Sequence, residues 1–381
     1  MTFEKIPRCA RDDTVLRPPS FGLLPYVRPV TALEPVRWGI LGAANIAVKK
    51  VIPAMRASRL AVPVAIASRD IAKARAAAAA LGIPRAYGSY EELLADTDVE
   101  AVYNPLPNHL HVPWSIRAAQ AGKHVLCEKP IALSASEART LLAARDANHV
   151  QIAEAFMVRT HPQWQEVERV IASGRVGGLR LMTAHFSYYR RDPADIRSQL
   201  ASGGGALMDV GCYPIFLARW MFGTEPDAVV AMIERDPDME IDRLTSAMMR
   251  FPTGQATFTC AGQLGPYQRV HLFGERGRIE VEIPFNAPPD RPCRIFVDDG
   301  SQFAGASAEV IETPATDQFT VQADRFSEAV RGVGTVPVSL ETSVGNMEVI
   351  DALFRSAERG GWVSVGPSIQ NPGFFGSLGN S

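Results

Sequence analysis

The sequence predicts an α/β protein with two domains: a doubly wound parallel sheet, then an α/β domain with a large, open and mostly antiparallel sheet. Its 381 residues are enough for two hydrophobic cores. Over residues 36–157, short apolar runs alternate with helical stretches, which is typical of βαβ units. Beyond residue 158 the apolar runs follow one another with short turns, which favours antiparallel pairing.

The elements of the first domain follow from this alternation. Strands are expected at residues 36–41, 62–68, around 86, 99–104, 123–128 and 150–155. Helices are expected up to residue 58 and over residues 70–82, 89–95, 108–121 and 134–148, the last with a serine cap. Parallel order follows because each strand is separated from the next by a helix.

The second domain is expected to be richer in strands. Strands are expected at 179–189, 227–235, 244–252, 254–262, 269–282 and 294–299, with helices at about 205–221, 319–332 and 341–359. The domain is taken as residues 158–381. Before the first strand, residues 1–35 form a proline-rich arm with Pro7, Pro18, Pro19, Pro25, Pro29 and Pro35. A disordered tail is the alternative interpretation of the arm.

Composition excludes several classes of protein. A formal net charge of -2 argues against a partner such as nucleic acid or an anionic membrane surface. The five cysteines form no CxxC pair, so we expect neither a metal site nor a disulfide framework. The N-terminus lacks the apolar core of a secretion signal, and no run of about 18 apolar residues is present. These features predict a cytoplasmic protein with no membrane span.

A turn after the first strand fits a relaxed dinucleotide fingerprint, G-x-A-x-x-A. Gly42 permits the tight turn, Ala44 lets a pyrophosphate approach, and Ala47 allows close packing of helix on sheet. Asn45 and Ile46 complete the turn at a helix N-terminus, where phosphates bind. An ordinary turn of small residues is the alternative.

The end of the second strand indicates which nicotinamide cofactor binds. An NAD enzyme places an acidic residue there for the ribose 2′-hydroxyl, but this chain has Ser68 and Arg69, with Lys73 one turn on. A hydroxyl and two cations suit the 2′-phosphate of NADP(H). Asp70 could instead serve NAD, and Arg69 could be a solvated residue at a helix start.

Two further motifs carry titratable groups. Glu128, Lys129 and Pro130 follow a buried strand at the edge of the sheet where doubly wound folds bind ligands, and Pro130 is a candidate for a cis bond. In "GGGALMDVGCYP", Asp209 and Tyr213 are four residues apart and share a helix face. A tyrosine acts as acid or base if a nearby ammonium lowers its pKa, and Lys129 is the candidate. The alternatives are a surface ion pair, a helix cap and a core aromatic.

Together with "PLPNHLH" and "EAFMVRTHPQ", these motifs resemble the glucose–fructose oxidoreductase / inositol dehydrogenase / rhizopine-catabolism family over about residues 36–365. The resemblance implies a Rossmann domain, a second domain whose open sheet commonly makes a dimer or tetramer contact, and a catalytic lysine at Lys129. It also places Asp209 and Tyr213 in the active site. Many members have histidine at the position of Tyr213. The tyrosine form resembles the branch with glucose–fructose and aldose–aldose oxidoreductases.

The same resemblance extends to other positions. The cofactor side is expected to include Pro105, Leu106, Asn108, His111, Glu128, Lys129, Pro130 and Arg159. The substrate side is expected to include Arg159, His161, Tyr189 and Arg197, besides Lys129, Asp209 and Tyr213. For His111 and His161, a structural hydrogen bond is the alternative.

The resemblance implies an NADP(H)-dependent oxidation of a cyclic aldose at C1 to an aldonolactone, with Tyr213 as general base and Lys129 beside it. The arm resembles one that covers the cofactor, and a retained cofactor would have to be reoxidised in place by a second aldose. The alternatives are a dehydrogenase that releases NADPH, a nucleotide-sugar ketoreductase and a non-catalytic NADP-binding sensor.

Overall fold

The computed structural model describes residues 33–303 and 305–366, and the predicted arm therefore lies almost entirely outside the described residues. The first domain is built on a parallel sheet with the strand order β3-β2-β1-β4-β5-β6. Its strands are β1 (Val36–Leu41), β2 (Ala61–Ala67), β3 (Arg85–Tyr87), β4 (Ala101–Asn104), β5 (His124–Cys127) and β6 (Ile152–Glu154). This is the doubly wound order of a Rossmann fold.

Helices connect these strands, and three of the helices begin at a residue whose side chain caps them. They are a π-helix η1 (Ala47–Val51), α1 (Ile52–Ala57), α2 (Ile71–Leu81), α3 (Tyr90–Ala95), η2 (Asn108–Leu110), α4 (His111–Gln120) and α5 (Ala135–Asn148). The side chains of Asp70, Ser89 and Ser134 accept backbone N–H groups at the starts of α2, α3 and α5. Gly82 ends α2 in the left-handed conformation, which glycine adopts without strain.

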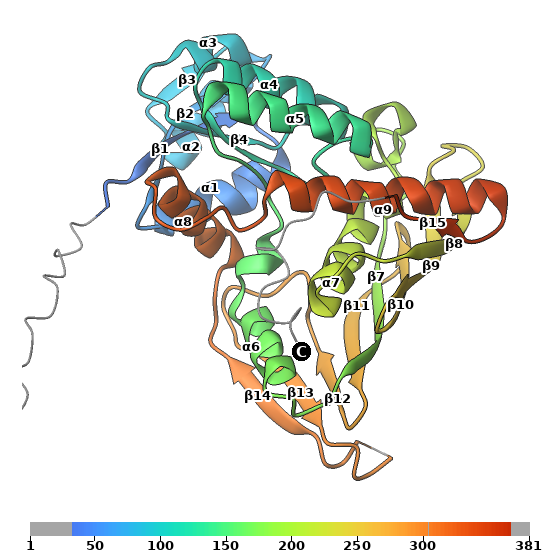
Figure 1. The fold of residues 1–381 in the computed structure, drawn as a ribbon. Helices are drawn as coiled ribbons and strands as arrows, with labels where there is room; N and C mark the ends of the chain where they lie inside the picture. The colour runs from blue at the N-terminus through green and yellow to red at the C-terminus, as the bar shows by residue number, and fades with distance from the viewer. Residues whose placement is uncertain (1–32, 304, 367–381) are drawn as a thin grey trace, which may run out of the picture. The chain divides into compact units, whose positions relative to one another are not determined.

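The second domain is built on a nine-stranded sheet with the order β14-β13-β12-β11-β7-β10-β9-β8-β15 (Figure 1). Its strands are β7 (Leu179–Tyr189), β8 (Ala228–Arg235), β9 (Asp242–Phe251), β10 (Gly254–Ala261), β11 (Gln263–Gly274), β12 (Arg278–Val281), β13 (Cys293–Asp298), β14 (Glu309–Thr313) and β15 (Val363–Ser364). Only the central pair β7 and β10 is parallel among these strands.

The remaining helices are η3 (Met157–Thr160), α6 (Pro162–Ala172), η4 (Ile196–Ser198), η5 (Leu200–Ser202), the π-helix η6 (Leu207–Gly211), α7 (Cys212–Phe222), α8 (Gln318–Val330) and α9 (Leu340–Arg359). Helix α8 returns to the first domain, where the ring of Phe326 lies 5.3 Å from that of Trp38 in β1. Thr320 of α8 also donates to the carbonyl of Ala54. The predicted division into domains at residues 36–157 and 158–381 did not include this contact of α8 with the first domain.

Helix α9 lies along α5 and joins the two halves (Figure 1). The N–H of Ala135 donates to the carboxylate of Asp351, and Arg145 donates to Glu341. Because β5 and α5 flank the Lys129 loop, these contacts fix the second domain against the edge of the first sheet where that loop lies.

One segment, Leu200–Phe222, is long and apolar enough to span a membrane by length and composition, although no run of about 18 apolar residues was expected. In the structure most of this segment is buried inside the protein, and every residue of α7 is buried. This is the environment of a core helix that packs between sheet and neighbours.

The predicted fold class is confirmed, including the mostly antiparallel second sheet. The expectation missed α6, β14 and the short β15, and a turn divides the expected 269–282 strand between β11 and β12. β15 has only two residues, so its pairing with β8 comes from tertiary position and not from a sequence pattern.

Candidate active site

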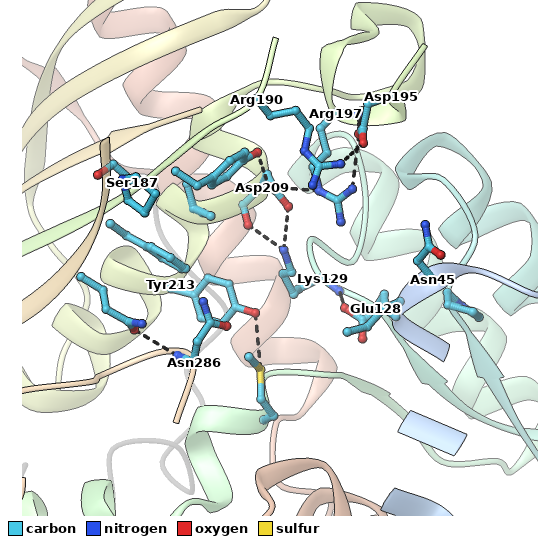
Figure 2. A pocket seen from close by; sticks show the side chains of 18 of the residues that line it. Asn45, Glu128, Lys129, Ser187, Arg190, Asp195, Arg197, Asp209, Tyr213 and Asn286 are labelled. Atoms are coloured by element: carbon cyan, nitrogen blue, oxygen red, sulfur yellow. Dashed lines mark hydrogen bonds and ion pairs between the residues drawn. The ribbon is translucent and has the colours of Figure 1, made fainter. Parts of the chain in front are cut away.

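A cleft of about 1340 Å³ opens at the carboxyl ends of β1, β4 and β5 and extends to the second sheet (Figure 2). Residues from both domains line it, including Asn45, Leu106, Lys129, Tyr188, Asp209 and Tyr213. In doubly wound folds this edge of the sheet binds the ligand, because the turns after the strands converge there. The cleft is therefore the candidate active site.

The turn after β1 fits the dinucleotide fingerprint. Gly42 has a φ of 103°, and a Cβ there would lie 3.1 Å from Cδ2 of Leu106, so a side chain is disfavoured by both strain and space. Ala44, Asn45 and Ile46 line the cleft directly after it. The backbone of this turn can thus be approached closely by a pyrophosphate.

At the end of β2 the structure separates the acidic residue from the cations. Asp70 caps α2: one of its carboxylate oxygens accepts the N–H groups of Ala72 at 3.0 Å and Lys73 at 3.4 Å. Ser68 Oγ accepts the N–H of Asp70 at 3.2 Å. Arg69 and Lys73 are exposed and form no ion pair within the described part of the chain. Arg69 lies close enough to Tyr90 to act on the pKa of its hydroxyl, and neither Arg69 nor Lys73 lines the cleft itself.

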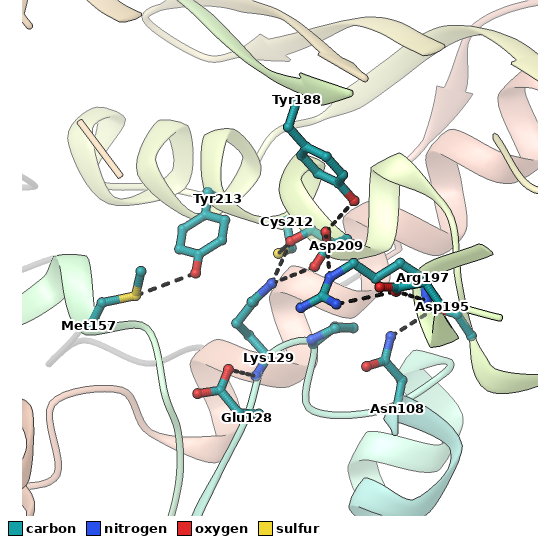
Figure 3. A network of polar contacts seen from close by, with 12 residues as sticks. Asn108, Glu128, Lys129, Met157, Tyr188, Asp195, Arg197, Asp209, Cys212 and Tyr213 are labelled. Carbon is teal, nitrogen blue, oxygen red and sulfur yellow. Dashed lines mark hydrogen bonds and ion pairs between the residues drawn. The ribbon is translucent and has the colours of Figure 1, made fainter. Parts of the chain in front are cut away.

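Lys129 is held at the centre of the cleft (Figure 3). Its Nζ donates to Oδ1 of Asp209 at 2.9 Å and to the Asp209 carbonyl at 2.6 Å, and only 14% of each side chain is exposed. The Lys129–Pro130 peptide is cis, as the sequence suggested. Although burial opposes it, the Asp209 carboxylate raises the pKa of Lys129 above its usual range, so the ammonium form persists at neutral pH.

The carboxylate of Asp209 connects Lys129 with Tyr188 and Arg197. Its Oδ2 accepts the hydroxyl of Tyr188 at 2.6 Å and lies 3.3 Å from Nε of Arg197. Burial favours the neutral acid, but Lys129 and Arg197 outweigh it and hold the pKa of Asp209 well below its usual range. The carboxylate is therefore ionised, and it fixes Lys129 from the side opposite the cleft wall that holds Tyr213 (Figure 3).

Tyr213 stands beside this pair in an aromatic wall. Lys129 Nζ lies 5.2 Å from the centroid of its ring, and its hydroxyl lies 3.4 Å from the sulfur of Met157. Burial raises the pKa of Tyr213, and the Lys129 ammonium only partly opposes this. The expected net lowering of this pKa is therefore wrong for this structure, because Lys129 is engaged by Asp209 and the phenol is buried.

Comparisons with known proteins agree with this arrangement. The model described as "Oxidoreductase family, NAD-binding Rossmann fold" matches residues 36–156, and the "GFO/IDH/MocA C-terminal domain" matches residues 164–280. The chain is 50% identical over 334 residues to "Uncharacterized oxidoreductase ORF334" of Rhizobium meliloti, covering 87% of this chain and 100% of that protein. The chain belongs to the GFO/IDH/MocA oxidoreductase family.

More specific similarities are found within this family. "D-xylose 1-dehydrogenase (NADP(+)) 2" of Haloferax volcanii is 40% identical and covers 86% of this chain and 99% of its own length. The structure of KijD10, a 3-ketoreductase from Actinomadura kijaniata with NADP and TDP-benzene, is 31% identical with a TM-score of 0.79, covering 85% and 98%. The aldose–aldose oxidoreductase from Caulobacter crescentus is 26% identical with a TM-score of 0.79, covering 87% and 100%. The chain is thus an enzyme, an NAD(P)-dependent oxidoreductase of this family.

Several expected cofactor residues of this GFO/IDH/MocA chain form the frame of the cleft. His111 is buried and bridges the carbonyls of Pro130 and Leu106 at 2.7 Å each, which ties the Lys129 loop to the loop after β4. Glu128 accepts the hydroxyl of Tyr103 at 2.5 Å. Pro105 also lines the cleft, and Asn108 donates to the Gly203 carbonyl at 2.8 Å. The contacts of His111 are those of a structural hydrogen-bonding residue, which was the alternative to a role in cofactor binding.

Arg159 and His161 do not line the cleft, contrary to expectation. The guanidinium of Arg159 lies 4.1 Å from the ring of Trp220, and the wholly buried His161 caps α6 by accepting the N–H of Gln163 at 3.2 Å. Burial lowers the pKa of His161 to about 4, so it is neutral. Arg159 in η3 thus packs on α7, and His161 after η3 serves as the cap of α6.

Tyr189 was also expected on the substrate side of the cleft and is not found there. It is 65% exposed and does not line the cleft, while its neighbour Tyr188 does and contacts Asp209. Successive side chains of a strand point to opposite faces, so a choice between adjacent tyrosines depends on knowing the face of β7. Arg197 lines the cleft as expected, between Asp195 and Asp209.

The described residues contain no group of three or more His, Cys, Asp and Glu side chains that could hold a metal ion. The polar groups of the cleft include the Lys129–Asp209 pair and the side chains of Tyr188 and Arg197 that contact Asp209. Such a site is equipped for proton transfer next to a nicotinamide cofactor.

Proposed function

We propose that this enzyme is an NADP(H)-dependent sugar oxidoreductase that oxidises a cyclic aldose at C1 to an aldonolactone. The observation that carries the proposal is the ionised Lys129–Asp209 pair, 2.9 Å apart, directly beside the Tyr213 ring in a cleft that opens at the dinucleotide turn. Its similarity to a D-xylose 1-dehydrogenase over nearly the whole of that relative supports the aldose as substrate class.

The groups that hold the cofactor follow from the site. The Gly42 turn and the N-terminus of η1 would hold the pyrophosphate, and Arg69 and Lys73 would bind the 2′-phosphate because Asp70 is engaged as a cap. When bound, NADP(H) accepts or supplies the hydride at C4 of its nicotinamide. Two cations that form no ion pair among the described residues would favour the 2′-phosphate of NADP(H) over the free hydroxyl of NAD(H).

The protein's own residues would move the proton. Lys129, kept charged by Asp209, would donate a hydrogen bond to the C1 oxygen and orient it. In oxidation the C1 hydroxyl proton would pass to the Tyr213 phenolate oxygen as the C1–H bond breaks with its electron pair. In reduction the Tyr213 hydroxyl would return a proton to the carbonyl oxygen. The raised pKa of Tyr213 makes proton donation the more favourable of its two roles at neutral pH.

A finer question is whether the cofactor leaves after each turnover. The likeness to an aldose–aldose oxidoreductase supports a form in which a second aldose is reduced to an alditol by the retained cofactor. To test this, the purified protein is denatured, released nucleotide is quantified, and intact protein is assayed with aldoses and no added cofactor. Stoichiometric NADP(H) with lactone and alditol in equal amounts supports retention, and nucleotide-free protein supports a simple dehydrogenase.

A second candidate is a nucleotide-sugar ketoreductase, favoured by the KijD10 structure, of which this chain covers 98%. Activity on a keto nucleotide sugar with none on any free aldose would establish it. A non-catalytic sensor is disfavoured because Lys129, Asp209 and Tyr213 are all present and in contact. We also propose that the protein is a cytoplasmic homodimer or homotetramer. Sedimentation of the purified protein measures its oligomeric state and tests this.

A further inference from the structure

The segment Ile283–Asn286, between β12 and β13, forms a wall of the cleft next to Tyr213. Ile283 and Asn286 line the cleft, while Phe285 is wholly buried and stacks on Phe186 with 4.6 Å between ring centroids. The ring of Phe285 also lies 5.5 Å from that of Tyr213. Asn286 is therefore one residue away from an aromatic ring that packs on the proposed acid–base group.

Side chains from three other elements anchor the backbone of this segment. Carbonyls of Ile283, Pro284 and Phe285 accept from Gln163 at 3.0 Å, Trp164 at 2.9 Å and Gln318 at 3.2 Å. Oε1 of Gln268 in β11 accepts the N–H groups of Phe285 at 2.9 Å and Asn286 at 3.0 Å. Since Gln163, Trp164 and Gln318 are buried, their hydrogen bonds are shielded from water and hold the backbone of the segment in place.

The Asn286 carboxamide is the polar group that this anchoring presents to the cleft (Figure 2). Among the described residues no hydrogen bond of that carboxamide is formed, whereas its backbone N–H is engaged by Gln268. A carboxamide offers donors and an acceptor without charge, which matches a sugar hydroxyl, itself both donor and acceptor. A polar side chain carried on an anchored backbone near the reaction centre discriminates between substrates that do and do not satisfy it.

From this geometry we infer that Asn286 is a specificity-determining contact to one hydroxyl of the sugar away from C1, and that Gln268 is the positioning residue for it. The inference rests on the proposed aldose oxidation and names what selects the aldose. The contact exists in both the bound substrate and the transition state, so it acts on KM more than on kcat.

The test compares wild type, Asn286→Ala and the control Asp290→Ala, an exposed residue of the same connection that does not line the cleft. Each is assayed with the preferred aldose and its mono-deoxy analogues. We expect Asn286→Ala to raise KM about tenfold, the effect of one lost hydrogen bond, with kcat little changed. For the analogue lacking the contacted hydroxyl, Asn286→Ala and wild type should have equal KM values.

Two outcomes overturn the inference: an unchanged KM in Asn286→Ala, or an equal loss with every deoxy analogue. The positioning role is tested with Gln268→Ala, which should reproduce the selectivity loss, and Gln268→Glu, which keeps an acceptor for both N–H groups and should restore it. Equal behaviour of these two variants contradicts it. NADPH affinity, followed by fluorescence, should be unchanged in all variants.

A failure of the proposed function gives a different result. If wild type oxidises no aldose, the catalytic proposal fails, and the same series is then measured as equilibrium binding of sugars to the NADP-loaded protein. Weaker binding by Asn286→Ala that disappears with one deoxy analogue supports the contact. Equal binding by both proteins contradicts it.

Discussion

Replacing Lys129 by alanine removes the charged centre of the cleft while leaving its surroundings satisfied. Asp209 would keep the hydroxyl of Tyr188 at 2.6 Å and Nε of Arg197 at 3.3 Å, so its carboxylate is not left alone. We therefore expect a loss of stability of about 1–3 kcal/mol, below the 3–5 kcal/mol typical when a buried charge loses every partner.

The catalytic loss should be larger. An oriented proton-transfer assistant contributes about 10²–10⁴ in rate, which equals about 3–5.5 kcal/mol of transition-state free energy. The Lys129→Ala variant is assayed for kcat/KM with the preferred aldose, together with NADPH affinity and thermal unfolding. Lys123→Ala is the matched control, because that ammonium donates only to the backbone carbonyls of Asp96 and Val99, away from the cleft. A folded Lys129→Ala enzyme within tenfold of wild type would refute the assigned role.

Three further variants change the cofactor contact, the proton-transfer group and the N-terminal arm. Arg69→Ala should weaken NADP(H) binding by about tenfold or more and leave NAD(H) binding nearly unchanged, and an equal loss for both in titration calorimetry would make Arg69 structural. Because burial keeps Tyr213 protonated through neutral pH, the rate of aldose oxidation should rise with pH beyond about pH 9, while the rate of reduction stays flat. Tyr213→Phe should abolish this pH dependence. An oxidation rate that levels off below about pH 8 would contradict the assignment. Deleting residues 1–30, which lie outside the described residues, should yield folded protein with less co-purifying nucleotide, and full retention through dialysis would exclude a cofactor-covering arm.

The sequence predicted the parts of the site that short motifs encode. Gly42, Lys129, Asp209 and Tyr213 each lie in a run whose residue types have a local physical reason, and the structure brings the last three together. Arg69 and Asp70 were separable only once the cap of α2 was seen, since both fit a cofactor role by position alone.

Other parts depend on tertiary structure that local patterns do not encode. Tyr188 and Tyr189 differ only in which face of β7 each occupies. Arg159 and His161 follow β6 closely in sequence, but they contact α7 and α6 and do not reach the cleft. The aromatic wall and Asn286 come from a connection about 70 residues beyond Tyr213, without any motif around it. The net direction of the Tyr213 pKa required knowing that its ring is buried.

The most direct test of the central claim is the transfer of deuterium from C1 of an aldose to the cofactor. The enzyme is incubated with NADP+ and the preferred aldose carrying deuterium at C1, and cofactor and sugar product are analysed by mass spectrometry. C1 oxidation predicts an unlabelled aldonolactone with an equal amount of singly deuterated NADPH or, if the cofactor is retained, of singly deuterated alditol. Unlabelled NADPH formed with a sugar product that keeps its C1 deuterium, or no aldonolactone from any aldose, would contradict it.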